Sequence, residues 1–263
     1  VASEETEPAM GWAYASFLSS LIENPGMDGA ELARLVVDSY VSADYRITDD
    51  DARVAFIEEN YDNGQGMSAE DVAADMSQDI TLSAIDLSVV SPLNQAVNEF
   101  ALAIGNADQS SVAAARSYSQ SYTSVFDKGI PDSFIDLGHF VQLAADESGD
   151  QNVATAAQNV MDWIDQAVIS EKHGDLRSGS TGLAFYFPNS KLYSLTTDED
   201  FGSYTSIANR FAAASLWDDF LVFHYTDKPI NTDTADLTVL APVSSASTQD
   251  FSEAIDASAL EAD

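Results

Sequence analysis

Long stretches of helical periodicity, broken by short runs that suit β-strands, most strongly limit what this chain can fold into. Apolar residues recur every three to four positions through much of the sequence, which is the pattern of helices that bury one face. The pattern predicts helices at 12–23, 32–40, 91–104, 110–126, 133–145, 152–170 and 210–223. Together they favour a helical bundle, and no internal repeat is visible.

Two short runs predict strands. Ile80 to Leu87, "ITLSAIDL", alternates apolar and polar residues, which is typical of a strand with one covered face. Thr181 to Pro188, "TGLAFYFP", is a continuous apolar run ended by proline and predicts a fully buried strand. Val1 to Ser3 predicts the end of a further, buried strand. The acidic, Gly-containing segment 43–79 predicts an inserted loop with one helix near 68–76.

The division into domains follows the loss of this periodicity. The region 1–225 carries all the predicted helices and strands, whereas 226–263 is rich in Thr, Ser and Asp and predicts an acidic tail or linker. At 45% hydrophobic residues, the chain has enough apolar side chains for a substantial core.

The charge balance is strongly acidic. The 44 Asp and Glu residues against 10 Lys and Arg give a formal net charge of −34, which argues against nucleic acid as a partner and favours cationic ligands. Such self-repulsion is relieved at high ionic strength, so the composition suits a protein adapted to salt. An ordinary acidic secreted protein is the alternative interpretation.

Several kinds of site are not indicated by the sequence. There is no Cys, which excludes a disulfide, a thiolate zinc site and a cysteine nucleophile within these residues. No apolar run is long enough to predict a membrane span, and no export signal is recognisable. His139, His173 and His224 lack partners at metal-ligand spacing, and "SGSTG" at 178–182 precedes a strand rather than following one, unlike a nucleophile elbow.

Two acidic clusters remain as candidate sites. Asp49 to Asp51, with Asp62, Glu70 and Asp71, could attract calcium, although a solvated acidic face is the alternative because the twelve-residue loop pattern is missing. Glu4, Glu5 and Glu7 directly follow the predicted strand end at Ser3. Ligands often bind beyond strand ends, so a carboxylate there could pair with a cationic side chain, with Trp12 and Tyr14 as an apolar wall. The alternative is a solvated loop whose aromatic residues cap the first helix.

Five segments occur in the order found in the clostripain-like cysteine peptidases, relatives of the caspase and gingipain group. They are "VASEETEPAMGWAYASFL", "TLSAIDLSVV", "SFIDLGHFVQLAA", "GLAFYFPNSKLYS" and "FAAASLWDDFLVFHY", and they extend from Val1 to Tyr225. The resemblance implies an α/β fold: the C-terminal part of a three-layer α/β/α caspase-like sandwich with an added helical bundle.

The resemblance also implies a function for the whole protein. Members of that family cleave after Arg or Lys, often process themselves into light and heavy chains, and include a calcium-dependent enzyme. Their catalytic His and Cys would lie upstream of this chain, so we expect no catalytic residue here and no activity from the chain alone. Ser3, Glu4, Glu5, Trp12 and Tyr14 match the family pattern and become candidate substrate-binding residues. Pro8-Ala9 stands where the family has Pro-Gly, which leaves the exact pocket carboxylate open.

The expected partners are therefore the N-terminal part of the same protein and peptide substrates with basic residues, in a secreted or cell-surface setting. Calcium is the cofactor that the resemblance suggests. One alternative is a non-catalytic acidic module that binds cationic peptides or supports a larger surface protein. A second is an acidic helical protein of unrelated function.

Overall fold

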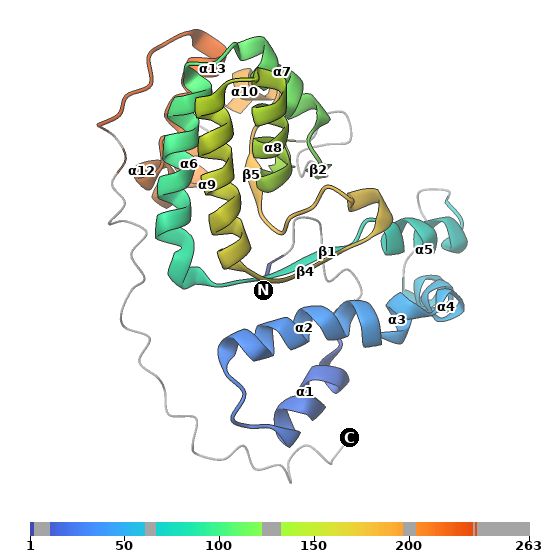
Figure 1. Ribbon diagram of the computed structural model, residues 1–263. Helices are drawn as coiled ribbons and strands as arrows, with labels where there is room; N and C mark the ends of the chain where they lie inside the picture. Colours follow the sequence, from blue (N-terminus) through green and yellow to red (C-terminus); the bar gives the residue numbers. More distant parts are fainter. Residues whose placement is uncertain (3–10, 61–66, 123–132, 197–203, 234, 236–263) are drawn as a thin grey trace.

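The computed structural model describes residues 1–2, 11–60, 67–122, 133–196, 204–233 and 235. Helices dominate these residues, and short strands form two small sheets (Figure 1). The α-helices are α1 (Tyr14–Glu23), α2 (Gly29–Ala43), α3 (Tyr45–Thr48), α4 (Asp50–Asn60), α5 (Ala69–Gln78), α6 (Val90–Gly105), α7 (Gln109–Tyr118), α8 (Leu137–Ser148), α9 (Gln151–Ala167), α10 (Ser190–Thr196), α11 (Tyr204–Ile207), α12 (Asn209–Ala214) and α13 (Trp217–Thr226). The strands are β1 (Thr81–Ile85), β2 (Ser121–Tyr122), β3 (Phe134–Asp136), β4 (Val168–His173) and β5 (Ala184–Tyr186); η1 (Leu87–Val89) and η2 (Asp175–Arg177) are 3₁₀ turns.

Acidic side chains start many of these helices. Asp28, Asp108, Asp136 and Asp150 each accept a hydrogen bond from a backbone N–H of the first turn that follows, at α2, α7, α8 and α9 respectively. A carboxylate at this position satisfies an amide that has no partner inside the helix and interacts favourably with the helix dipole. Part of the large acidic excess therefore serves to fix where helices begin.

The main core lies where helices α6 to α9 and α13 pack around the sheet β2-β3-β5. Helix α9 lies between α6 and α8, with β5 behind them in Figure 1. At the centre, the Phe140 ring contacts Phe100, Phe187 and Trp217, with ring centroids 5.3–6.2 Å apart. The Trp217 indole N–H donates to the Tyr186 carbonyl over 2.7 Å, so this fully buried aromatic of α13 is also fixed to β5.

The second sheet links this bundle to the N-terminal helices. β1 pairs antiparallel with β4, from Thr81↔His173 to Ile85↔Val168, and α2 packs on both strands. In Figure 1 the β1–β4 pair runs between the bundle and α2. Val37 and Tyr40 of α2 form a separate apolar cluster with the β1 side.

A glycine allows the chain to pass close to α5 where β4 ends. The Gly174 N–H donates to the Ile80 carbonyl over 2.8 Å. A Cβ atom on Gly174 would lie 2.3 Å from the Gln78 backbone oxygen, too close for any other residue without a backbone shift.

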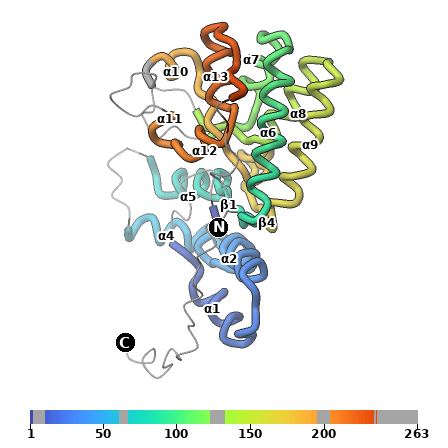
Figure 2. Tube along the Cα trace, turned by 90° about the vertical axis from the view of Figure 1, so that its left-hand side faces the viewer, coloured from blue at the N-terminus to red at the C-terminus, as the bar shows by residue number. Residues whose placement is uncertain are grey.

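Helices α4 and α5 lie side by side next to this sheet (Figure 2), and α3 packs on α4. One buried arginine joins the three helices. The Arg53 guanidinium donates to the Ala73 carbonyl at 2.7 Å and the Ile47 carbonyl at 2.6 Å, and it pairs with Asp50. Arg53 is 2% exposed, so its donors replace water at these carbonyls.

The structure confirms a mixed helix and sheet fold and most of the predicted helices, with several corrections. Residues 45–60, predicted as loop, form α3 and α4. The helix predicted at 110–126 ends at Tyr118, and the one predicted at 152–170 ends at Ala167, where β4 begins. The strand predicted at 181–188 is limited to β5, and the helix predicted at 210–223 is divided into α12 and α13.

The strand arrangement bears on the expected sandwich. Every strand pair among the described residues is antiparallel. At the strand end predicted for 1–3, Ala2 forms an isolated antiparallel bridge with Ser83 of β1. The expected burial is not found, because Val1 and Ala2 are exposed, and Ser3 lies outside the described residues. The three-layer caspase-like sandwich stays a prediction. Beyond Tyr225, Ile230 and Ala235 still pack against the main core.

Candidate functional site

The predicted substrate-binding residues are only partly within the described structure. Ser3, Glu4 and Glu5 lie outside it. Trp12 is partly buried and its ring meets Tyr40 edge-on, with centroids 6.2 Å apart, beneath the β1–β4 sheet. Tyr14 is 57% exposed on α1 and contacts Phe17. The two aromatic residues have different neighbours, so Trp12 is held by the core while Tyr14 is accessible to a ligand.

The backbone next to Trp12 is anchored by an arginine. The Arg46 guanidinium donates to the Gly11 carbonyl over 3.2 Å and binds Asp44 with both Nε and Nη2. The hydrogen bond to Asp44 raises the pKa of Arg46. Asp44 lies at the junction of α2 and α3 and is 5% exposed. Its ion pair with Arg46 therefore holds Gly11, next to Trp12, against this junction.

A buried polar network occupies the end of β3, within the segment "SFIDLGHF" that sequence reasoning assigned to the framework. Asp136 accepts hydrogen bonds from the His139 N–H at 2.7 Å, the Thr181 N–H at 2.6 Å and the Thr181 hydroxyl at 2.7 Å. The Tyr122 hydroxyl lies 3.3 Å from the same carboxylate and 2.7 Å from the Ser180 hydroxyl. These contacts account for a fully buried carboxylate and support its framework role.

The three histidines have local partners. His139 Nδ1 accepts from the Gln120 N–H at 3.0 Å, and His173 Nδ1 lies 2.8 Å from Glu171. His224 Nδ1 lies 2.7 Å from the Gln109 amide oxygen, and burial lowers the pKa of His224. Within the described part of the chain, no three His, Asp or Glu side chains gather as metal ligands would.

The candidate calcium ligands that are described serve helix starts. Asp49 accepts from the Ala52 N–H at 3.0 Å, and Glu70 and Asp71 lie in the first turn of α5. Asp62 lies outside the described residues. Calcium binding therefore stays a prediction.

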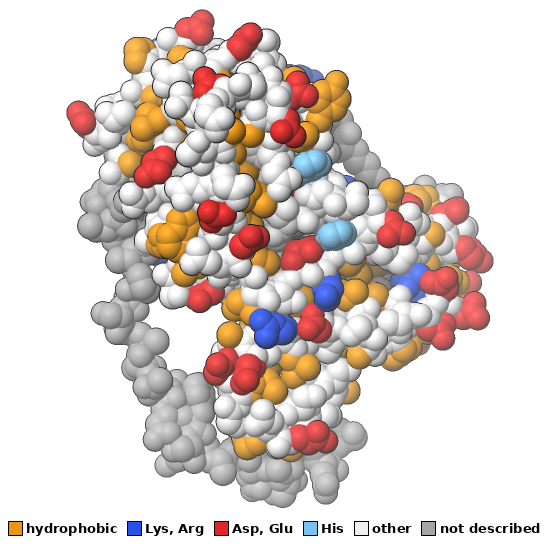
Figure 3. Space-filling view, in the orientation of Figure 1, with side chains coloured by type: hydrophobic (Ala, Val, Ile, Leu, Met, Phe, Trp, Pro, Cys, Tyr) orange, Lys and Arg blue, Asp and Glu red, His pale blue; other side chains and the backbone are white. Residues whose placement is uncertain are grey.

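One face of the molecule shows how the charges are distributed (Figure 3). Acidic side chains are spread over it, while Lys and Arg gather near its middle. Two of the cations bridge α2 and β4: Arg34 of α2 donates to the Ile169 carbonyl of β4 at 3.2 Å, and Lys172 of β4 lies 3.9 Å from Asp38 of α2. These cations tie α2 to the sheet.

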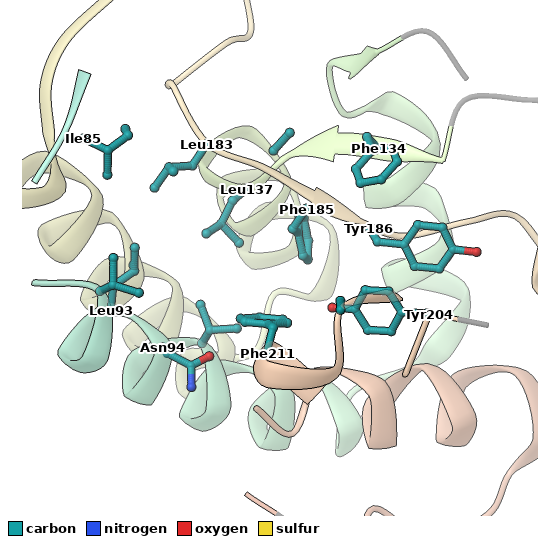
Figure 4. A pocket seen from close by; sticks show the side chains of 14 residues that line it. Ile85, Leu93, Asn94, Phe134, Leu137, Leu183, Phe185, Tyr186, Tyr204 and Phe211 are labelled. Atoms are coloured by element: carbon teal, nitrogen blue, oxygen red, sulfur yellow. The ribbon is translucent and has the colours of Figure 1, made fainter. Parts of the chain in front are cut away.

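A pocket that sequence reasoning did not predict lies between β3–β5 and helices α6, α11 and α12 (Figure 4). Its volume is about 310 Å³, and its wall is mainly apolar, with aromatic side chains such as Phe185, Tyr204 and Phe211. The sequence signals at Phe185 and Phe211 are those of core residues, since apolar periodicity does not distinguish a filled core from a lined cavity.

Comparison with known proteins shows to which protein family the chain is related. The model of the clostripain family, a peptidase family, matches residues 1–225. The chain belongs to the clostripain family. It is thus related to cysteine peptidases, as the ordered segments predicted. No curated protein and no solved structure matches the chain.

Clostripain-family chemistry limits what this chain can do by itself. A cysteine peptidase needs a thiolate, an imidazole and an oxyanion hole at the scissile bond. The 263 residues contain no Cys, so they cannot supply the nucleophile. Among the described residues, no helix is long and apolar enough to cross a membrane.

Proposed function

We propose that this chain is the distal, heavy-chain part of a cysteine endopeptidase that cleaves peptide bonds after Arg or Lys. The clostripain-family match over residues 1–225 is the observation that carries the proposal. Because the chain has no Cys, the catalytic thiol belongs to another part of the full protein. We place the thiol and its imidazole partner before Val1, as the resemblance to the family implies.

In this proposal the chain contributes the late part of a three-layer α/β/α caspase-like sandwich and one wall of the substrate cleft. Ser3, Glu4 and Glu5 follow directly on Ala2, which pairs with Ser83 of β1. A carboxylate there would bind the guanidinium or ammonium group of the substrate, while the exposed ring of Tyr14 would contact its aliphatic stem. Trp12 supports this wall from the core side.

The setting of the enzyme is part of the same proposal. We place it outside the cell or at the cell surface, with calcium as a candidate cofactor and basic peptides or proteins as substrates. The net charge of −34 supports cationic substrates, because a strong negative field raises their local concentration.

The test uses the full protein that contains this chain, together with the 263-residue chain alone. Fluorogenic peptides should differ only before the scissile bond, with Arg, Lys or norleucine, the last having a similar stem without charge. We expect cleavage after Arg and Lys by the full protein, none after norleucine, and none by this chain alone or after Cys→Ala substitution of the nucleophile.

Variants then test the cleft residues. Glu4→Gln or Glu5→Gln should lower kcat/KM for the Arg substrate by at least about tenfold without changing the thermal midpoint, because one carboxylate loses its charge. Glu23→Gln, at the exposed end of α1, is the matched control. A full protein that cleaves none of the peptides would favour the non-catalytic acidic binding module, and equal cleavage after norleucine would contradict basic specificity.

A further inference from the structure

Helix α1 exposes a stripe of large apolar side chains. Tyr14, Leu18 and Ile22 are 57%, 43% and 76% exposed, and they recur every four residues, so they lie along one side of the helix. Single exposed apolar residues are ordinary, whereas aligned ones form an apolar helix face without a partner. The other large apolar side chains that are exposed in the described structure lie singly at separate places in the fold: Val1, Tyr45, Met67, Leu87, Tyr118, Leu176 and Ile207.

The described residues leave this side of α1 open. No residue of α1 is buried. The helix packs mainly on α2, and both lie at the end of the molecule away from α6 to α9 (Figures 1 and 2). Helix α1 contains no Lys or Arg, and its one acidic residue is Glu23 in the last turn. The stripe therefore suits an apolar partner and not one that is held by charge.

The size of the stripe favours a segment of the same chain. The ten residues of α1 make it about 15 Å long, so a strip about 10 Å wide along it covers roughly 150 Å². Stable interfaces between separate molecules bury about 800 Å² on each partner. A second copy would also bring another net charge of −34. A tethered segment needs far less area, because the tether keeps it at an effective concentration on the order of millimolar.

The sequence at 250–262 has the pattern of an amphipathic helix. Asp250, followed by Glu253 three residues later, is the signature of a capping box at a helix start. Phe251 and Ile255 have the same four-residue spacing as the stripe on α1. The apolar positions on this side of the helix are Phe251, Ala254, Ile255, Ala259 and Ala262.

This segment can reach α1. The described residues extend to Ala235, which packs against the main core. The intervening stretch 236–249 spans up to about 45–50 Å when it is extended. A compact domain of this length has a radius of gyration of roughly 18 Å, so every part of its surface lies within that reach.

We propose that residues 250–262 form a helix that packs on the exposed side of α1, with Phe251 and Ile255 against the stripe of Tyr14, Leu18 and Ile22. Both partners belong to a strongly acidic chain, so docking should strengthen at high salt, where repulsion among carboxylates is screened. Tyr14 is also part of the proposed substrate wall, so the docked helix would compete with substrate there if the peptidase proposal holds. The docking itself does not depend on that activity.

A distance measurement tests the contact directly, because the chain has no Cys and accepts a single pair of labels. Ser19→Cys, at an exposed position beside the stripe, and Ser252→Cys in the segment each receive a nitroxide. Pulsed electron paramagnetic resonance of the 263-residue chain in 1 M KCl should give a narrow distance distribution below about 25 Å, because packed helix axes lie 8–10 Å apart. A mixture of singly labelled chains should not show this distance.

Matched variants in the segment test which side of the helix docks. Ile255→Asp should lower the ratio of docked to free segment by at least about tenfold, because it removes a buried aliphatic side chain. Leu260→Asp introduces the same charge on the opposite side of the helix and should leave the distance distribution unchanged. Both substitutions lie outside the described core, so a loss of docking cannot come from its unfolding.

Variants of the described structure test the receiving surface. Leu18→Asp should reduce docking as Ile255→Asp does, and Leu87→Asp, at an exposed apolar position of η1, is the control that should not. A broad distance distribution in the doubly labelled chain would overturn the proposal. So would a short distance in mixtures of singly labelled chains, or equal losses in Ile255→Asp and Leu260→Asp.

Discussion

Asp218 is a residue whose surroundings disfavour its own charge. It lies in the first turn of α13, and its Oδ1 is buried without a hydrogen-bond partner among the described residues. Burial, followed by the nearby charge of Asp219, raises the pKa of Asp218 to about 6. The folded protein therefore holds a proton at this site over a pH range in which the unfolded chain has released it.

This shift predicts that the folded state loses stability as pH rises. The folded pKa lies above the ordinary value of 3.8, so the cost of ionising Asp218 appears between about pH 4 and 6 and persists at higher pH. Asp218→Asn should remove this loss and stabilise the protein at pH 7 by about 1–2 kcal/mol, a figure reduced to allow for solvent screening. Urea unfolding at a series of pH values measures it.

The control for this variant must remove the same amount of charge. Asp165→Asn on α9 does so at an exposed position, and it should leave the pH dependence of the unfolding free energy unchanged. Equal effects of the two substitutions would mean that net charge, rather than the burial of Asp218, determines the difference.

At the residue scale, single side chains were a weaker guide to the family of this chain than the order of its longer segments. The ordered segments led to the clostripain family, which the family match confirmed. The aromatic pair Trp12 and Tyr14 could not be separated into a core residue and an exposed one, because burial depends on α2, which lies elsewhere in the sequence. Nothing in the sequence marks Asn94 as unusual. Its amide nitrogen binds the carbonyl of the distant Ala214, and only the fold shows that its amide oxygen is left without a partner among the described residues.

At the scale of elements, the packing of α3, α4 and α5 depends on one arginine. Arg53 of α4 donates to carbonyls of α3 and α5, so replacing it leaves buried acceptors unpaired. We expect Arg53→Met to lower the free energy of unfolding by about 3–5 kcal/mol or to melt this unit locally. Hydrogen exchange should then accelerate over residues 45–60 and 69–78.

The exposed Lys228→Met provides a control that removes one positive charge in the same way, and it should leave exchange in both segments unaltered. Arg53→Lys should recover only part of the protection, because an ammonium group cannot reproduce the planar fork of a guanidinium. Normal exchange in Arg53→Met would show that apolar contacts alone hold α3 to α5 together.

Element boundaries were the least predictable part of the fold, for identifiable reasons. Helix α4 has a weak apolar stripe, because its buried side is partly made by Arg53 and not by a run of aliphatic residues. The predicted helix at 152–170 ran into β4 because Val168 and Ile169 continue the apolar pattern, and only pairing with β1 makes them a strand. Tertiary pairing thus overrides local periodicity.

For the whole molecule, several of the few cations connect segments that are distant in the sequence. Arg34, Arg116 and Arg177 each donate to a backbone carbonyl of another element, at Ile169, Phe187 and Ser121 respectively. Such contacts hold the chain together locally, but the net charge of −34 that remains after every Lys and Arg is counted has no compensating side chain.

Uncompensated charge predicts stabilisation by salt. The screening length falls from about 10 Å at 0.1 M salt to about 3 Å at 1 M, which weakens repulsion among the surface carboxylates. We expect the thermal midpoint to rise by at least about 5 °C over this range of KCl, roughly 1–2 kcal/mol.

The control is sucrose at equal osmotic concentration. Sucrose is excluded from the protein surface and stabilises the fold in that way, but it does not screen charge. A larger rise in KCl than in sucrose supports adaptation to salt, whereas a midpoint that rises no more in KCl than in sucrose would favour the ordinary acidic secreted protein.

The pairing of Thr81 with His173 has a consequence for how the molecule forms. The entire α6 to α9 hairpin series lies between these two strands in the chain, so β1 leaves the ribosome well before its partner exists. Contacts between such distant residues form late, after the local helices have collapsed. Until then α2, which is synthesised earlier and packs on β1 in the folded protein, can cover the apolar side of the nascent strand.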